Sequence, residues 1–264
     1  MRSFLVICCI TTGCDANLTP QPAPPAPVPS CVPNRDGMID ATEVPIALGV
    51  TIDEYVSSSQ KTIDQQGSGT PRTWDFSTEY GDDTRVSVGP TALDTQWFAA
   101  SFPGGQFVAD AGDGKDGVYA KDDTALWLLG LASHDMSPPS GKTILRYDAP
   151  VAVLRFPLHD GDAWTETGHV TSGTLDGLPY VGTDTYEIDV SGLGTVLVPY
   201  VRFDPALRVR THVTVAPAAG GATISRRQTQ FFFECFGEIT RAESKPNEPS
   251  PDFTLAATLR RFAL

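Results

Sequence analysis

Strict alternation of polar and apolar residues marks the most regular part of the chain, between residues 180 and 237. A period of two is typical of a strand with one buried face and one solvated face. The alternating runs are residues 185–190, 195–198 and 208–215. The joints between them, which carry the glycine, proline and aspartate residues of turns, are residues 191–194, 203–205 and 217–221. The pattern predicts an antiparallel β-meander.

Shorter runs predict strands along most of the remaining chain. Residues 126–129 are apolar on both faces, as in a central strand, and residues 230–236 are too apolar to face water on either side. Trp74 and Phe76 share one face of a short strand, so we expect both in the core. The other predicted strands are residues 50–56, 84–88, 96–100, 106–109, 117–120, 143–147, 151–156, 164–170 and 253–262.

These elements predict a mainly β fold, with one antiparallel domain over residues 31–264. Because a sheet of about a dozen strands must curl or fold on itself, we expect a strongly curved sheet (an incomplete barrel) or a two-layer β-sandwich. A domain of this length buries enough surface to be stable without additional cross-links. Since the chain ends in a predicted strand, deleting its final ten residues is expected to unfold the domain.

Residues 1–13 have the layout of a signal peptide, with Arg2 near the start, an apolar run and the small residue Gly13 before Cys14. This ending resembles a bacterial lipobox, although Thr11 stands where that family has leucine. The resemblance implies that Cys14 is lipidated and becomes the mature N-terminus. It also implies attachment to a membrane through the lipid anchor and localisation in the cell envelope. An ordinary secretory leader is the alternative.

Residues 14–30 would form a spacer between the lipidated cysteine and the folded domain. Proline occupies nearly every second position in this segment. Such a segment cannot build a core and adopts the extended polyproline II conformation, at about 3.1 Å per residue. It could therefore hold the domain about 50 Å from the bilayer. A proline-rich peptide ligand for another domain is the alternative.

Only Cys31 and Cys235 remain in the predicted domain once Cys14 and the cysteines of the leader are set aside. Two cysteines in an exported chain predict a disulfide. It would close a loop of about 200 residues and contribute on the order of 5 kcal/mol to stability. Two buried free thiols are the alternative.

Residues 32–43 resemble the calcium-binding loop of the EF-hand, preceded here by the proline-rich segment rather than by a helix. Val32 stands where the loop normally has its first aspartate, which removes one charged ligand. The resemblance implies a weak calcium site, and a loop that keeps its turn but has lost the metal is the alternative. The side chains at the family's ligand positions are Asn34, Asp36, Asp40 and Glu43.

Three short runs resemble exported β-proteins of Gram-negative bacteria. They are Trp-Asp-Phe-Ser at residues 74–77, Gly-Thr-Val-Leu at residues 194–197 and Leu-Arg-Val at residues 207–209. This resemblance implies export and a β domain, and it carries no assigned activity.

Charge and motifs exclude several classes of function. The chain has 19 basic and 32 acidic residues, and its net charge of −13 argues against nucleic acid as a partner. The sequence has no Gly-x-Ser-x-Gly elbow, no His-Glu-x-x-His helix and no glycine-rich dinucleotide turn. A turn explains the neighbouring His159 and Asp162, and a solvated hairpin turn explains the acid-rich residues 110–117 better than cation binding does.

Two functions remain. The first is a non-catalytic, lipid-anchored envelope protein that binds an apolar ligand or another envelope protein. The alternative is a surface hydrolase of carbohydrates that uses paired carboxylates, which leave no sequence signature. An apolar hollow lined by residues such as Phe231 and Phe233 would favour the first function. A cleft with two acids about 5 to 10 Å apart would favour the second.

Overall fold

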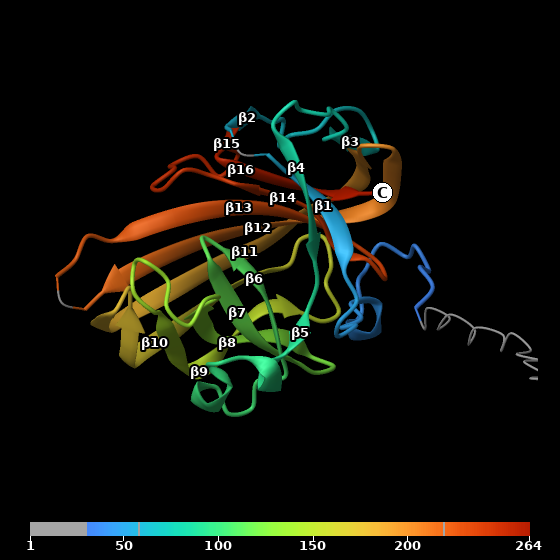
Figure 1. Ribbon diagram of the computed structural model, residues 1–264. Coiled ribbons are helices and arrows are strands. Elements are labelled where there is room, and N and C mark those ends of the chain that lie inside the picture. The colour runs from blue at the N-terminus through green and yellow to red at the C-terminus, as the bar shows by residue number, and fades with distance from the viewer. Residues whose placement is uncertain (1–30, 58, 219) are drawn as a thin grey trace, which may run out of the picture. The chain divides into compact units, whose positions relative to one another are not determined.

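The described part of the chain is residues 31–57, 59–218 and 220–264 of a computed structural model, and it consists almost wholly of β-strands (Figure 1). The predicted leader, Cys14 and the predicted spacer lie outside these residues. The short 3-10 helices are η1 (Ala41–Glu43), η2 (Leu93–Thr95) and η3 (Ala99–Ser101). The strands are β1 (Ile52–Ser57), β2 (Lys61–Thr62), β3 (Arg72–Asp75), β4 (Asp83–Val88), β5 (Thr91–Ala92), β6 (Phe107–Gly112), β7 (Lys115–Lys121), β8 (Ala125–Ser133), β9 (Ile144–Arg155), β10 (Ala163–Leu175), β11 (Leu178–Val198), β12 (Val201–Pro217), β13 (Ile224–Phe233), β14 (Gly237–Glu243), β15 (Leu255–Ala256) and β16 (Thr258–Ala263).

One 14-stranded sheet contains nearly all of these strands, in the order β4-β1-β16-β14-β13-β12-β11-β10-β9-β8-β7-β6-β5. The neighbours along this path pair antiparallel, and β3 adds a parallel pair with β11. Strands β2 and β15 form a separate two-stranded ladder. The predicted mainly β, antiparallel fold is therefore confirmed, and the sheet is open rather than a closed barrel.

The sheet curls until its two ends approach each other. Its edge strands β4 and β5 are consecutive in the chain and are separated only by Gly89 and Pro90. Ion pairs also join opposite parts of the sheet: Arg260 Nη1 of β16 lies 2.7 Å from Asp110 Oδ2 of β6. Figure 1 shows β6–β8 (green) and β13, β14 and β16 (orange to red) as opposite walls of this curve. Curling lets a sheet of this size bury both of its faces.

Apolar side chains cover both faces of the sheet. On β13, Phe232 belongs to an inner cluster with Leu128 and Ile188, and we call the face that carries Phe232 the inner face. Phe231 and Phe233 point the opposite way, into an outer cluster that holds Trp74 and Phe76. Residues 231–233 are thus buried, as predicted, but the prediction for residues 230–236 is wrong at its end, because β13 stops at Phe233 and Phe236 in the following turn is 48% exposed. The core positions expected for Trp74 and Phe76 are confirmed. A third cluster, with Phe98, Phe102 and Leu129, lies beneath η2 and η3.

Several boundaries differ from the prediction. The turns expected at residues 191–194 and 203–205 are absent from the described chain, because β11 and β12 continue through them with local shifts in register. A β-bulge accommodates glycine or proline and bends a strand without ending it. Residues 143–147 and 151–156 belong to the single strand β9. Residues 96–100 are not a strand and instead lead into η3, where Phe98 packs beneath the turn.

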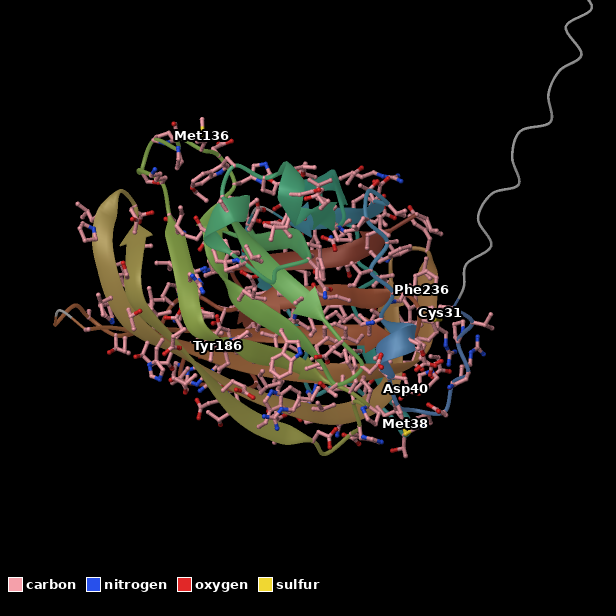
Figure 2. All side chains as sticks on the ribbon, turned by 90° about the horizontal axis from the view of Figure 1, so that it is seen from below. Cys31, Met38, Asp40, Met136, Tyr186 and Phe236 are labelled. Atoms are coloured by element: carbon pink, nitrogen blue, oxygen red, sulfur yellow. A yellow bond between two sulfur atoms is a disulfide. The ribbon has the colours of Figure 1, made fainter. Side chains whose placement is uncertain are left out.

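The N-terminal and C-terminal ends of the described domain are both fixed to the sheet. The sulfur atoms of Cys31 and Cys235 lie 2.01 Å apart, at the bonding distance that the predicted disulfide requires. Strand β16 lies between β14 and β1, so the chain ends inside the sheet, as expected. Residues Cys31–Leu264 form one compact unit. Cys31 and Phe236 lie at one side of the molecule, away from Met136 of the β8–β9 connection (Figure 2).

Candidate functional site

The inner face of the sheet changes from apolar to ionic between β13 and β1. Glu238 of β14 pairs directly with Phe232, and Arg241 of β14 pairs with Arg260 of β16. Because paired residues lie on one face of a sheet, these charged side chains project inward. Glu54 of β1 lies beside them, with Oε2 3.9 Å from Nη1 of Arg260. The ionic part of the inner face is therefore made by residues from three adjacent strands.

Ion pairs and hydrogen bonds hold most of these charges. Arg241 donates from Nε and Nη2 to the two carboxylate oxygens of Glu238, each at 2.8 Å. Arg260 reaches across the curve to Asp110, and the partly buried Tyr119 of β7 lies near enough to Arg241 and Glu238 to interact with their charges. Buried charges are tolerated only when they are paired in this way.

Glu54 is the exception within this group. Burial, together with the negative charge of Glu238, raises the pKa of Glu54 to about 7, although Arg260 and Arg241 act in the opposite direction. Within the described residues, Oε2 of Glu54 and Nε of Arg260 are buried and have no hydrogen-bond partner. The carboxyl group of Glu54 therefore gains and loses its proton near neutral pH.

A cavity of about 670 Å³ opens at the free edges of the sheet, next to Asp110. Its wall is made by the β4–β5 connection, the β6–β7 hairpin, the end of β8 and the segment that leads into β9. Aspartates dominate the charged side chains of the lining. These side chains are Asp110, Asp113, Asp116, Asp135 and Asp176, together with Lys115 and His134. The cavity is therefore strongly acidic.

Asp110 and Asp116 are direct partners across β6 and β7. Side chains at such positions have Cβ atoms about 5 Å apart. Burial raises the pKa of Asp116, and His134 offsets only part of that effect. Burial also acts to raise the pKa of Asp110, but the N–H of Gly112 and the charge of Arg260 together lower it below its ordinary value. The pKa values of the two carboxyl groups are thus shifted in opposite directions, although both groups line one cavity.

His134 lies against Asp116 at the mouth of this cavity. Its Nδ1 is 3.1 Å from Oδ2 of Asp116. The imidazole is 71% exposed whereas the carboxylate is only 8% exposed, so the buried acid orients a ring that remains accessible. With Nδ1 engaged by Asp116, Nε2 is the ring nitrogen that can contact a ligand.

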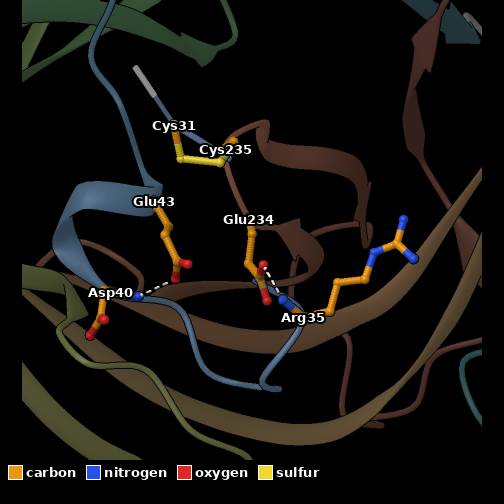
Figure 3. Close-up of a disulfide and its surroundings, with 6 residues drawn as sticks. All are labelled: Cys31, Arg35, Asp40, Glu43, Glu234 and Cys235. Atoms are coloured by element: carbon orange, nitrogen blue, oxygen red, sulfur yellow. Dashed lines mark hydrogen bonds between the residues drawn. A yellow bond between two sulfur atoms is a disulfide. The ribbon is translucent and has the colours of Figure 1, made fainter. Parts of the chain in front are cut away.

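The EF-hand-like loop is held by its own hydrogen bonds, and Figure 3 shows the one between Asp40 and Glu43. Asn34 Oδ1 accepts from the N–H of Asp36 at 2.8 Å, and Asp36 Oδ1 accepts from the N–H of Met38 at 2.9 Å. Glu43 Oε2 accepts from the N–H of Asp40 at 2.9 Å, which caps η1. Across the described chain, no group of three or more histidine, cysteine, aspartate or glutamate side chains is placed to hold a metal ion. Calcium binding at this loop stays a prediction.

The disulfide brings one further acid to this loop. Glu234, next to Cys235, accepts a hydrogen bond from the N–H of Arg35 at 2.7 Å. Burial is the main cause of a raised pKa at Glu43, and Glu234 adds to it despite the hydrogen bond from Asp40. Cys31 and Glu43 thus lie beside the β13–β14 turn, which fixes the start of the domain to the sheet (Figure 3).

The remaining residues considered as site candidates have structural roles. The N–H of His159 donates to Oδ2 of Asp162 at 2.8 Å, which forms the predicted turn before β10. The ring of Phe231 packs 5.0 Å from that of Trp74, and the ring of Phe233 packs 5.2 Å from that of Phe203. Phe231 and Phe233 are therefore packed core residues of the outer cluster rather than the lining of an apolar hollow.

Sequence reasoning missed the grouping of Asp110, Asp116 and His134. Asp116 and His134 are 18 residues apart, and only the pairing of β7 with β8 brings them together. The signal that could have revealed this pair is the turn at residues 122–124. Counting outward from that turn along both strands places residue 116 opposite residue 130, and the offset pairing with its register shift between Val118 and Tyr119 moves the actual partner to Ala132. Residues 113 and 114 form the hairpin turn that the sequence predicts.

Comparison with protein-family models, with curated proteins and with solved structures finds no match to this chain. None of the helices in residues 31–57, 59–218 and 220–264 has the length and apolar character needed to cross a membrane. Function must therefore be inferred from the cavity and the inner face themselves.

Proposed function

We propose that this chain is a lipid-anchored protein of the cell envelope whose folded domain binds a positively charged ligand in the acidic cavity, without catalysis. The lipobox-like end of the leader at Cys14 and the proline-rich residues 15–30 support the anchor and the spacer. The disulfide partner Cys31 follows directly after the spacer. The folded domain would thus face the envelope space at the end of a tether.

The excess of carboxylates in the cavity carries the proposal about the ligand. The lining of this cavity of about 670 Å³ holds five aspartates but only one lysine and one histidine, and although Arg260 pairs with Asp110 and Arg226 with Asp113, carboxylates remain in excess and make its potential negative. A low-dielectric wall concentrates such a potential on a bound cation. An amine or a guanidinium group on the ligand would complement it.

Calorimetric titration with spermidine, a small flexible polyamine, tests this function. We expect binding that weakens steeply with added salt, because the attraction is electrostatic. The double variant Asp113→Asn, Asp135→Asn removes two exposed charges of the lining and should weaken binding several-fold. The matched control Asp123→Asn, Asp148→Asn removes the same charge from exposed positions outside the lining. Equal binding by both variants would show that only net charge attracts the probe.

A carbohydrate-active hydrolase is the second candidate, and the opposite pKa shifts of Asp110 and Asp116 favour it. In such an enzyme Asp116, which keeps its proton to higher pH, would donate that proton to the departing sugar oxygen. The ionised Asp110 would act as the nucleophile or the base.

A panel of 4-nitrophenyl glycosides separates the two candidates. Hydrolysis that is abolished by Asp110→Asn, the nucleophile or base, while the variant remains folded would establish the enzyme. Absence of turnover, or a rate that survives Asp110→Asn, would remove the hydrolase and leave the binding function.

A further inference from the structure

A second polar site lies within the apolar part of the inner face, on β9 and β11. Asp184 of β11 is only 2% exposed. The hydroxyl of Tyr147 donates to Oδ2 of Asp184 at 2.6 Å, and the hydroxyl of Tyr186 lies 2.8 Å from that of Tyr147. Tyr186 projects among the strands of the curved sheet in Figure 2. A carboxylate in such surroundings is costly to bury unless each of its oxygens is satisfied.

Two glycines make room for the tyrosines that converge on Asp184. A Cβ atom on Gly168, the cross-strand partner of Asp184, would lie 2.7 Å from the ring of Tyr147. A Cβ atom on Gly182 would overlap the hydroxyl of Tyr180, which comes before it on β11. The ring of Tyr180 therefore lies over Gly182 and extends along the strand toward Asp184. Both tyrosines depend on these glycines for their positions.

The direction of the hydrogen bonds follows from the order of the groups. Because Tyr147 gives its proton to Asp184, the hydrogen bond between Tyr186 and Tyr147 must be donated by Tyr186. Burial raises the pKa of Tyr147 and of Tyr186, so both phenols keep their protons. Oδ2 of Asp184 and the hydroxyls of Tyr147 and Tyr186 are thus all satisfied.

Two atoms of the site are left over. Oδ1 of Asp184 and the hydroxyl of Tyr180 are buried, and neither has a hydrogen-bond partner among the residues that the structure describes. Tyr180 is 8% exposed, and the negative charge of Asp184 adds to burial in raising the pKa of Tyr180, as expected for neighbouring groups. One leftover atom is an acceptor and the other is a hydroxyl that can donate. Leaving both atoms without a partner is costly, and one further molecule that reached both would satisfy them.

A hydroxyl group complements this pair because it accepts one hydrogen bond and donates another. We propose that Asp184 and Tyr180 bind the hydroxyl group of a small, otherwise apolar molecule on the inner face of β11. The ligand oxygen would accept from Tyr180 and donate to Oδ1 of Asp184. An ether oxygen can only accept, so it leaves Oδ1 of Asp184 without a donor, and an ammonium group can only donate, so it leaves the O–H of Tyr180 without an acceptor.

The surroundings suit an apolar body. Leu145 and Val170 of the inner cluster flank the tyrosines, and Val213 packs partly exposed against the same cluster. Leu178 precedes Tyr180 by two residues, shares its face of β11 and is 69% exposed. The strip from Leu178 to Asp184 thus runs from the surface to the buried carboxylate. This site is independent of the acidic cavity, because neither Asp184 nor Tyr180 lines that cavity.

Three probes of similar size test the proposal by ligand-observed NMR titration of the disulfide-bonded protein: 1-hexanol, methyl pentyl ether and hexylamine. We expect 1-hexanol to bind on the order of tenfold more tightly than the other two, which is the effect of one net hydrogen bond. Tyr180→Phe should lower the affinity for 1-hexanol to that for the ether. Tyr200→Phe removes a phenol hydroxyl at an exposed position and should change nothing.

The variant Asp184→Asn gives a second test, which measures the ratio of the affinities for 1-hexanol and the ether. A purely structural role of Asp184 would leave this ratio unchanged. The asparagine oxygen can still accept from Tyr147, but the amide now places a donor where Oδ1 stood. The preference for the alcohol over the ether should therefore disappear, because an acceptor alone satisfies both donors. Equal affinity of the wild type for 1-hexanol and the ether, preference for hexylamine, or unchanged binding in Tyr180→Phe would each overturn the proposal. Failure of spermidine to bind the acidic cavity would overturn the proposed function but would not affect this proposal about Asp184 and Tyr180.

Discussion

Glu54 shows how one residue gains unusual chemistry from strands that are far apart in sequence. Its strand β1 pairs with β4 and β16, and the charges around it come from β14, β16 and β6. Burial and Glu238 favour the neutral form, whereas Arg260 and Arg241 favour the ionised form. Since the result is a pKa of about 7, the protonation state of Glu54 is set by the whole inner face rather than by its sequence neighbours.

Glu54 should make the stability of the domain depend on pH. Its pKa is about 7 in the folded protein against 4.5 for an unperturbed glutamate, so the folded state binds the proton more tightly. The stabilising contribution is then complete below pH 4.5 and is lost as pH rises through 7. Glu54→Gln keeps a neutral side chain at every pH. We expect it to match the wild type near pH 4.5 and to be more stable above neutral pH, by on the order of 3 kcal/mol.

Urea unfolding at several pH values between 4.5 and 8 measures this difference. Glu79→Gln, at an exposed position, serves as the control and should leave a nearly constant difference from the wild type. A difference between wild type and Glu54→Gln that does not change with pH would contradict the raised pKa.

At the scale of single residues, the sequence predicted core residues better than residues of the candidate site. Trp74 and Phe76 could be placed because alternation alone defines the face of a strand on which a side chain lies. Asp110 and Asp116 could not, since an acid-rich glycine turn has the same composition whether its carboxylates are solvated or line a cavity. The pairing of His134 with Asp116 depends on strand register, which composition does not give.

The two longest strands show why some element boundaries were missed. Glycine at residues 192 and 194 and proline at residue 205 indicate turns when the chain is considered locally. Within β11 and β12 they lie instead at or beside shifts in register, where the sheet bends. Long-range pairing on both sides of these strands outweighs the local preference for a turn. The bends help the sheet to curl, so the unpredicted feature is part of the architecture.

Gly194 permits the close approach of β3 to β11. It pairs with Arg72 in the parallel ladder, and a Cβ atom at this position would overlap the carbonyl oxygen of Arg72. We expect Gly194→Ala to lower the free energy of unfolding by about 1 to 3 kcal/mol, because the backbone must shift. Urea denaturation measures the change.

Gly81→Ala is the matched control for this substitution, since nothing lies within 4 Å of a Cβ atom added there. The control should change stability little. Equal stability of the two variants would show that β3 can move away from β11 without cost.

At the scale of the whole molecule, the domain is a curved sheet in which the last strand, β16, lies between the early strand β1 and the late strand β14. Strand β16 pairs with β1 on one side and with β14 on the other, and Leu259 and Arg261 of β16 are almost fully buried. The sequence predicted the antiparallel class and the buried C-terminus from alternation and apolar runs. The pairing of β1 with β16 is a long-range contact, which local patterns do not specify.

Deleting the final ten residues removes β15 and β16 and separates β1 from β14. We expect the truncated protein to be unfolded or insoluble, because β1, β14 and β2 would each lose a ladder partner and the outer cluster would be opened. Circular dichroism and size-exclusion chromatography give the readout. Removal of Leu264 alone, which is 66% exposed, is the control and should be tolerated. A stable, monomeric truncated domain would contradict the role assigned to β16.

The disulfide joins the start of the domain to the β13–β14 turn across a sequence separation of 204 residues. In the chain-entropy description, breaking such a long loop costs about 5 kcal/mol, because the unfolded chain regains the freedom that the cross-link removed. The double variant Cys31→Ser, Cys235→Ser should therefore unfold at much lower urea concentration than the oxidised protein. The reduced wild type should behave like the variant, since both lack the same constraint. Two free thiols detected in the wild type after unfolding without reductant would show that the bond does not form. The untreated wild type and the double variant would then unfold at the same urea concentration.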